Sequence, residues 1–222
     1  YLAAPAFVDL KSGDGTVLAW PAGLVAEAVQ VVKLDRKADV AQARKAGGAI
    51  GRALSEAGTL VLAEGGRHLA ELSFGLALRA YDFTAHKTGS AKVPGPVTLM
   101  VPNPEAAAAE AAPLAALAEG VFFTRDLVNE PANVLTTYDF AARLAAMQEL
   151  GLDVEILEEE DLTKLGMRAL LGVGQGSESP SKVVVMHWRG GAKDEAPLAL
   201  VGKGVVFDTG GISIKPAGGM EE

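Results

Sequence analysis

Short apolar runs alternate with longer segments of helical periodicity in the first half of the chain, and this alternation restricts the fold to a mixed class. Apolar residues recur at helical spacing in residues 40–54 and 69–83. Residues 59–63 and 97–101 are short runs typical of buried strands. Helices placed between strands are the repeating pattern of α/β proteins. The sequence therefore predicts an α/β domain with a largely parallel sheet.

The residues before this alternation predict a β-hairpin. Residues 7–10 and 16–20 each have the pattern of a short strand. Between them, residues 12–15 are Ser-Gly-Asp-Gly, which is typical of a turn. We therefore expect the two strands to pair across this turn.

An alanine-rich stretch separates two parts of the chain. Residues 105–119 are expected to form a helix, because alanine has the highest helix propensity. Pro113 is expected to kink this helix or to begin a new one. A disordered linker is the alternative interpretation of such a composition. We expect a first α/β domain at residues 1–104, a connecting helical segment at 105–135 and a second domain at 136–222.

The second region also alternates between the two kinds of element. Thr137 is expected to cap a helix. Residues 161–165 predict a short helix, and residues 152–157, 182–188 and 198–201 predict strands. The last two runs are almost continuously apolar, as central strands are. The second region is therefore also expected to be α/β.

Composition limits the classes of function. The 222-residue chain has a net charge of −8 and no basic stripe, which argues against a nucleic-acid partner. The absence of cysteine excludes a disulfide scaffold, a thiolate zinc site and a cysteine nucleophile. No apolar run looks long enough to span a membrane, so no membrane association is expected. We expect a cytoplasmic protein; because the chain begins at Tyr1 rather than Met, a removed signal peptide stays an open alternative.

A glycine-rich segment with charged residues follows the last predicted strand. Lys203, Asp208 and Lys215 lie in residues 202–216, beyond the carboxyl end of that strand, where open α/β sheets form their sites. A carboxylate can bridge two divalent cations, and a lysine amine can bind a cation when it is neutral. A second lysine that stays protonated can stabilise a developing oxyanion. The alternative is that the lysines are ordinary surface residues and the aspartate a turn residue.

The string VGKGVVFDTGGISIKP at residues 201–216 closely resembles the signature of the leucyl aminopeptidase family, the M17 metallopeptidases. The stretch Arg-Asp-Leu-Val-Asn-Glu-Pro-Ala-Asn at residues 125–133 is similar to that family's interdomain helix and the loop after it. Residues 166–177 and, more loosely, 75–83 are also similar. The resemblance implies an N-terminal α/β domain and the first part of a catalytic metallopeptidase domain at residues 136–222.

The resemblance also implies roles for the three charged residues. Lys203 would bind the second, exchangeable metal ion, Asp208 would bridge both ions, and Lys215 would be the catalytic lysine. The implied metals are Mn²⁺ or Zn²⁺, with a bicarbonate ion as a candidate base. The implied reaction is the release of N-terminal residues, with a leucine-type preference, from peptide substrates by a homo-oligomer, specifically a hexamer.

Members of that family carry further ligands and an anion-binding arginine after the matched segment. These have no counterpart in the 222 residues, so we expect the chain to be a fragment or part of a longer enzyme. A polypeptide of these residues alone is expected to be inactive, because two ligands cannot fix two cations.

Two other interpretations stay open at the level of sequence. The run Phe-Asp-Thr-Gly at residues 207–210 also resembles the nucleophile loop of aspartic proteases, which would need a second copy of the loop. The chain could instead be a non-catalytic assembly or regulatory module.

Overall fold

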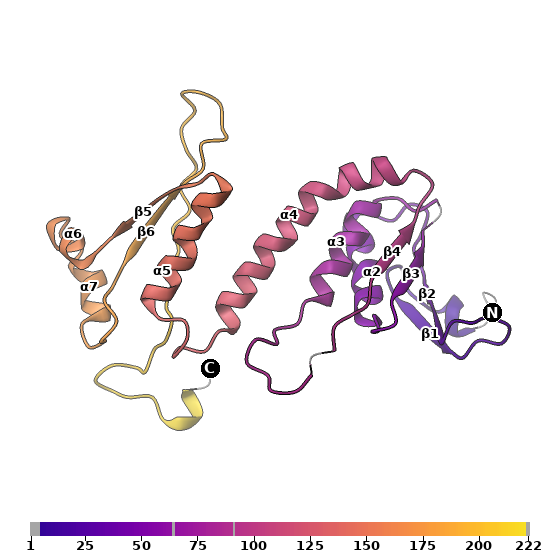
Figure 1. Cartoon of the computed structure of the whole chain (residues 1–222), viewed down its shortest axis with the longest axis horizontal. Helices are drawn as coiled ribbons and strands as arrows, with labels where there is room; N and C mark the ends of the chain where they lie inside the picture. Colours follow the sequence, from indigo (N-terminus) through magenta and orange to yellow (C-terminus); the bar gives the residue numbers. More distant parts are fainter. Residues whose placement is uncertain (1–4, 64, 91, 221–222) are drawn as a thin grey trace. The chain divides into compact units, whose positions relative to one another are not determined.

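The chain folds as two compact units, Tyr1–Asp126 and Leu127–Glu222, which we call the first and second units (Figure 1). The computed structural model describes residues 5–63, 65–90 and 92–220. Both units combine helices with strands, so the expected α/β class is confirmed.

The described part of the first unit, from residue 5, begins with a helix rather than with the expected strand at residues 7–10. In chain order it contains α1 (Pro5–Val8), β1 (Gly15–Ala19), β2 (Ala28–Val32), α2 (Val40–Arg52), β3 (Thr59–Leu62), α3 (Leu69–Ala80), β4 (Val97–Met100) and most of α4 (Pro104–Asn129). Pro5 begins α1, where its fixed φ favours a helix and its missing N–H costs nothing. The hairpin partner of β1 is β2, which lies antiparallel to it.

The expectation of a largely parallel sheet is wrong for the described residues. Strands β3 and β4 are parallel, because α3 carries the chain back between them. The pair β1–β2 is antiparallel across a short connection. In the second unit β5 and β6 are also antiparallel, because the helices between them return the chain to the end where β5 finishes.

The core of the first unit lies between α2, α3 and the β3–β4 pair. Its buried side chains are Ala46, Ile50, Val61, Leu72 and Leu76. The two helices approach each other closely through glycines. A Cβ at Gly47 would overlap the carbonyl oxygen of Leu72, and one at Gly75 would overlap that of Arg44. The missing side chains therefore allow backbone-to-backbone packing of α2 on α3.

Gly47→Ala is expected to destabilise the first unit by about 1–3 kcal/mol, the usual cost of forcing atoms into a packed core. The added methyl would also lie 2.7 Å from the Leu76 nitrogen, so the helices would have to move apart. Denaturant unfolding of the purified protein measures the effect. Gly48→Ala is the matched control, because its methyl would lie 4.0 Å from the nearest atom. Equal stability of the two variants would contradict the packing described.

Helix α4 continues through Pro113 as a single element, so the expected new helix at Pro113 is not observed. The expectation that no segment could span a membrane is wrong by length and composition. Among the described residues, α4 is long and apolar enough to do so, with a mean hydropathy of 1.4 over an 18-residue window. Much of this apolarity comes from small alanines, and Ala118 is the buried residue of the helix.

Residues 122–126 of α4 contact the end of α3 within the first unit. The Tyr81 hydroxyl donates to Asp126 Oδ1 at 2.7 Å, and the Tyr81 ring stacks on Phe122 with centroids 5.4 Å apart. The Arg125 guanidinium lies over the same ring and donates to the carbonyl oxygen of Leu78. These contacts join the segment before residue 127 to the first unit.

The second unit is built on a two-stranded antiparallel pair. Its elements are α5 (Thr137–Ala145), η1 (Ala146–Leu150), β5 (Asp153–Leu157), α6 (Glu159–Lys164), α7 (Arg168–Gly174), β6 (Val183–His187) and η2 (Ala217–Gly219). The cap of α5 is Thr136 rather than the expected Thr137. Thr136 and Asp139 form a capping box, in which each side chain accepts the other residue's backbone N–H.

The expected strand at residues 198–201 does not form. This segment has no regular structure, and Leu198, Leu200 and Val201 are 85%, 88% and 98% exposed. A strand needs a neighbour to accept and donate ladder hydrogen bonds, and among the described residues β6 pairs with β5 alone. An apolar run without such a neighbour is left irregular.

Candidate active site

Lys203 lies in the irregular segment that follows residue 201. Its side chain is exposed, and glycines precede and follow it. Gly204 lies against the ring of Phe140 on α5, because a Cβ at residue 204 would be 2.7 Å from Phe140 Cε1. A Cβ at Gly202 would meet nothing within 4 Å. The segment carrying Lys203 thus passes close to α5 at the glycine that follows the lysine.

Asp208 begins a tight loop. Its Oδ1 accepts a hydrogen bond of 2.8 Å from the backbone N–H of Gly210, which is the geometry of an Asx turn. Gly210 and Gly211 both have positive φ values, 99° and 86°, a region that other residues rarely adopt. The pair of glycines therefore turns the chain back immediately after Asp208.

Lys215 closes this loop. Its backbone N–H donates to the carbonyl oxygen of Thr209 at 2.9 Å, and the residue is half-buried. The crossing is close, since a Cβ at Gly210 would lie 2.6 Å from the Ser213 oxygen and 3.0 Å from the Lys215 nitrogen. The loop brings the backbones beside Asp208 and Lys215 together, whereas no hydrogen bond or ion pair among the described residues joins Lys203 to either.

The candidate residues are of chemical types that can bind a divalent cation, but they are too few to hold one by themselves. Asp208 offers a carboxylate, a hard oxygen ligand, and Lys203 offers an amine that can bind when neutral. The described residues contain no group of three or more His, Asp or Glu side chains that could hold a metal ion. Each cation needs several donors to replace its water, so these two residues can form only part of a metal centre.

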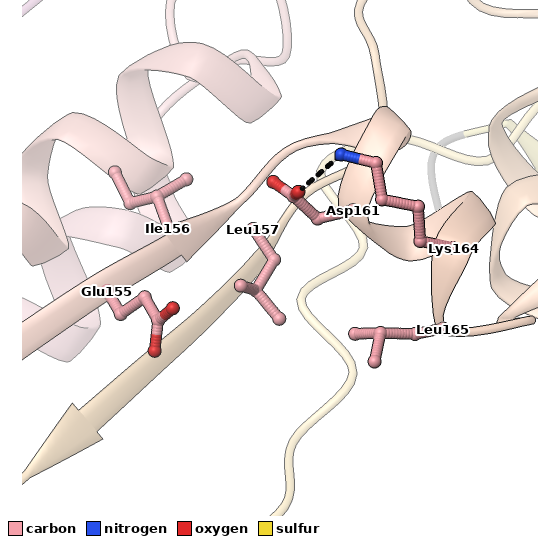
Figure 2. A pocket seen from close by; sticks show the side chains of 6 residues that line it. All are labelled: Glu155, Ile156, Leu157, Asp161, Lys164 and Leu165. Atoms are coloured by element: carbon pink, nitrogen blue, oxygen red, sulfur yellow. Dashed lines mark hydrogen bonds and ion pairs between the residues drawn. The ribbon is translucent and has the colours of Figure 1, made fainter.

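A separate open pocket of about 490 Å³ lies between β5 and the end of α6 (Figure 2). It is lined by Glu155, Ile156, Leu157, Asp161, Lys164 and Leu165. Figure 2 shows Glu155 and Leu157 on one side of β5 and Ile156 on the other, as strand geometry requires. Lys164 Nζ lies 3.4 Å from Asp161 Oδ1, and this ion pair partly neutralises the charge of the pocket. This pocket was not predicted from the sequence, although the period-two pattern of the strand could have placed Glu155 and Leu157 together.

Comparison with known proteins supports the family that the loop suggested. The sequence model of the cytosol aminopeptidase family's catalytic domain matches residues 122–222. The chain is 75% identical, over 220 residues, to a probable cytosol aminopeptidase of Cereibacter sphaeroides, and 60% identical over 217 residues to one of Dinoroseobacter shibae. These matches cover 99% and 98% of the chain.

The chain belongs to the M17 cytosol aminopeptidase family. It spans 45% and 44% of the length of these two M17 relatives. Among solved structures it is similar to the bottromycin maturation enzyme BotP in complex with Mn, with a TM-score of 0.74 and 30% identity over 94% of this chain and 46% of that one. A mutant of tomato leucine aminopeptidase shares the fold, with a TM-score of 0.74, 22% identity and coverage of 90% and 43%.

M17 membership confirms the predicted resemblance and removes the aspartic-protease interpretation. The Phe-Asp-Thr-Gly run at residues 207–210 lies inside the segment that the M17 catalytic domain matches. The roles of Lys203, Asp208 and Lys215 stay predictions.

Proposed function

We propose that the complete protein is a two-metal aminopeptidase that releases N-terminal residues from peptides, with a leucine-type preference. The observation that carries this proposal is the loop of residues 202–216. It lies inside the segment matched by the M17 catalytic domain, and its Asp208 and Lys215 are held on one closed turn. In this proposal the cations are Mn²⁺ or Zn²⁺; the choice of Mn²⁺ is supported by the similarity to BotP, whose structure is a complex with Mn.

Lys203 and Asp208 would hold the cations together with further donors. When bound, the paired cations would supply an activated water molecule and a polarised carbonyl. Asp208 is exposed and uses Oδ1 for the Gly210 N–H, which leaves Oδ2 and further lone pairs for cations. Lys203 would contribute the lone pair of its amine nitrogen, which a lysine can donate to a cation. A bicarbonate ion is proposed as the base.

Lys215 would act on the substrate rather than on the cations. Its backbone is fixed by the bond to Thr209, and the residue is half-buried, so its side chain has less freedom than an exposed lysine. A protonated amine fixed beside the scissile carbonyl would stabilise the negative charge that develops on the carbonyl oxygen. The two lysines would thus have different roles, Lys203 at the cations and Lys215 at the substrate.

We also propose a cytoplasmic location, a homo-oligomer and no membrane or nucleic-acid partner. The location is supported by relatives that are named cytosol aminopeptidases. The hexamer is proposed from the resemblance to the M17 family.

An anilide assay tests the proposed function. The complete protein, loaded with Mn²⁺ or Zn²⁺, is expected to hydrolyse leucine p-nitroanilide, to lose this activity with chelator and to regain it when metal returns. A polypeptide of residues 1–222 alone is expected to be inactive, because it holds only two of the proposed ligands. Chelator-sensitive turnover by that polypeptide would contradict the ligand assignment. Absence of turnover by the metal-loaded complete protein, on leucine and on other amino-acid anilides, would contradict the function and favour a non-catalytic module.

A further inference from the structure

Two segments that resemble the M17 family outside the candidate site meet inside the first unit. Residues 75–83 cover the end of α3 and the residues after it, and residues 125–133 begin near the end of α4. The Tyr81 hydroxyl, from the first segment, donates to Asp126 Oδ1, from the second, at 2.7 Å. Arg125 donates to a carbonyl oxygen of α3 and joins the two segments a second time. The candidate metal residues account for neither segment, whereas these contacts give both a shared structural role.

Aromatic and cationic contacts surround the hydrogen bond from Tyr81. Its ring stacks on Phe122, with centroids 5.4 Å apart and planes inclined by 24°. The Arg125 guanidinium carbon lies 5.3 Å from the centroid of the same ring. We call Tyr81, Phe122, Arg125 and Asp126 the Tyr81 cluster; all four residues are half-buried. Partial exclusion of water strengthens both a hydrogen bond to a carboxylate and a cation–π contact, so the cluster can hold the two segments together.

The Tyr81 cluster lies at the last residues of the first unit. This unit ends at Asp126, although α4 continues to Asn129. The match to the M17 catalytic domain begins at residue 122. Residues 122–126 therefore belong to the catalytic domain by sequence and to the first unit by packing.

We propose that the Tyr81 cluster is a folding clamp, which makes the order of residues 122–126 depend on the first unit. Tyr81 is the side chain that the end of α3 supplies, and the other three come from α4. The end of a helix at the edge of a compact unit opens at a low free-energy cost unless side-chain contacts hold it. The clamp bears on folding rather than on the reaction, so it holds whether or not the proposed function is correct.

Hydrogen exchange in the complete protein tests the clamp at the segment itself. Tyr81→Phe removes the hydroxyl and keeps the ring that stacks on Phe122. The amides of residues 120–129 are expected to exchange about 10–100-fold faster, because a hydrogen bond to a charged group changes an opening equilibrium by about that factor. Tyr81→Leu, which also removes the ring, is expected to add about 2–10-fold. Mass spectrometry of the peptides that cover this segment measures both rates.

Tyr138→Phe is the matched control, because it removes the same atom from a tyrosine of α5 that is 55% exposed. It is expected to leave exchange at residues 120–129 at the parental rate. The amides of α5 are the reference within each protein and should keep their rate in Tyr81→Phe. Unchanged exchange at residues 120–129 in Tyr81→Phe would overturn the clamp. Equal acceleration there and in α5 would overturn it too, since that result means a general loss of stability.

A double-mutant cycle of Tyr81→Phe with Asp126→Ala tests whether the two side chains act together. Each single variant removes the same hydrogen bond, so the double variant is expected to exchange little faster than the more affected single variant. Accelerations that multiply would mean that the two side chains act independently and would overturn the clamp. If Asp126→Ala does not fold, the comparison of Tyr81→Phe with Tyr138→Phe decides, and equal rates at residues 120–129 would overturn it.

Discussion

In the complete protein, Asp208→Asn is expected to lose metal at both positions, with affinity falling by about two orders of magnitude or more. The lower bound follows because removing residues that only orient a ligand already costs about 10–100-fold. Asparagine keeps the shape of the side chain and an oxygen that can accept from the Gly210 N–H, so the turn should survive. The change removes one negative charge that both cations share in the proposed site. Elemental analysis after dialysis measures the metal content.

Asp194→Asn is a matched control for the charge. Asp194 is an exposed aspartate of the second unit with a positive φ of 67°, which asparagine also adopts readily. It should keep the parental metal content. Equal metal content in Asp208→Asn and the parent would remove Asp208 from the proposed ligand set.

Lys215→Ala is expected to keep both metals and to lower kcat by about two to three orders of magnitude, the usual effect of losing one donor to a developing oxyanion. The closed loop supports this division, because the backbone of Lys215 is bonded to Thr209, whereas no hydrogen bond among the described residues joins Lys203 to the loop. Steady-state kinetics and metal analysis on one preparation measure both effects.

Lys193→Ala, which removes an exposed lysine from the loop after β6, is the control and should leave kcat unchanged. Loss of metal in Lys215→Ala would make Lys215 a ligand or a support for the ligands. A rise in KM alone would mean that only uniform substrate binding was lost.

Periodicity predicted the elements that build the core of the first unit. The ranges expected for α2, α3, β3 and β4 agree with the structure to within a few residues, because each carries a repeating apolar face against its neighbours. The same reasoning failed at residues 7–10, where Pro5 begins a helix. It failed again at residues 198–201, because β-propensity produces a strand only where a ladder partner is present.

The sequence motif of the candidate site could be recognised, but its three-dimensional arrangement could not be predicted. The sequence predicted Lys203, Asp208 and Lys215 as a group, and the M17 comparison supports the segment in which they lie. The bond from Lys215 to Thr209 depends on the φ values of Gly210 and Gly211, which no periodicity reveals. The contact of Phe140 with Gly204 joins residues far apart in the chain, so only the folded structure could show it.

The metal content of Lys203→Arg tests the central claim most directly, because it asks whether a lysine amine is a metal ligand. Arginine keeps a long cationic side chain but stays protonated and has no lone pair to donate. Elemental analysis of the Mn²⁺-equilibrated complete protein should find two ions per chain in the parent and one in Lys203→Arg, with aminopeptidase activity lost. Two ions per chain and full activity in Lys203→Arg would contradict the account.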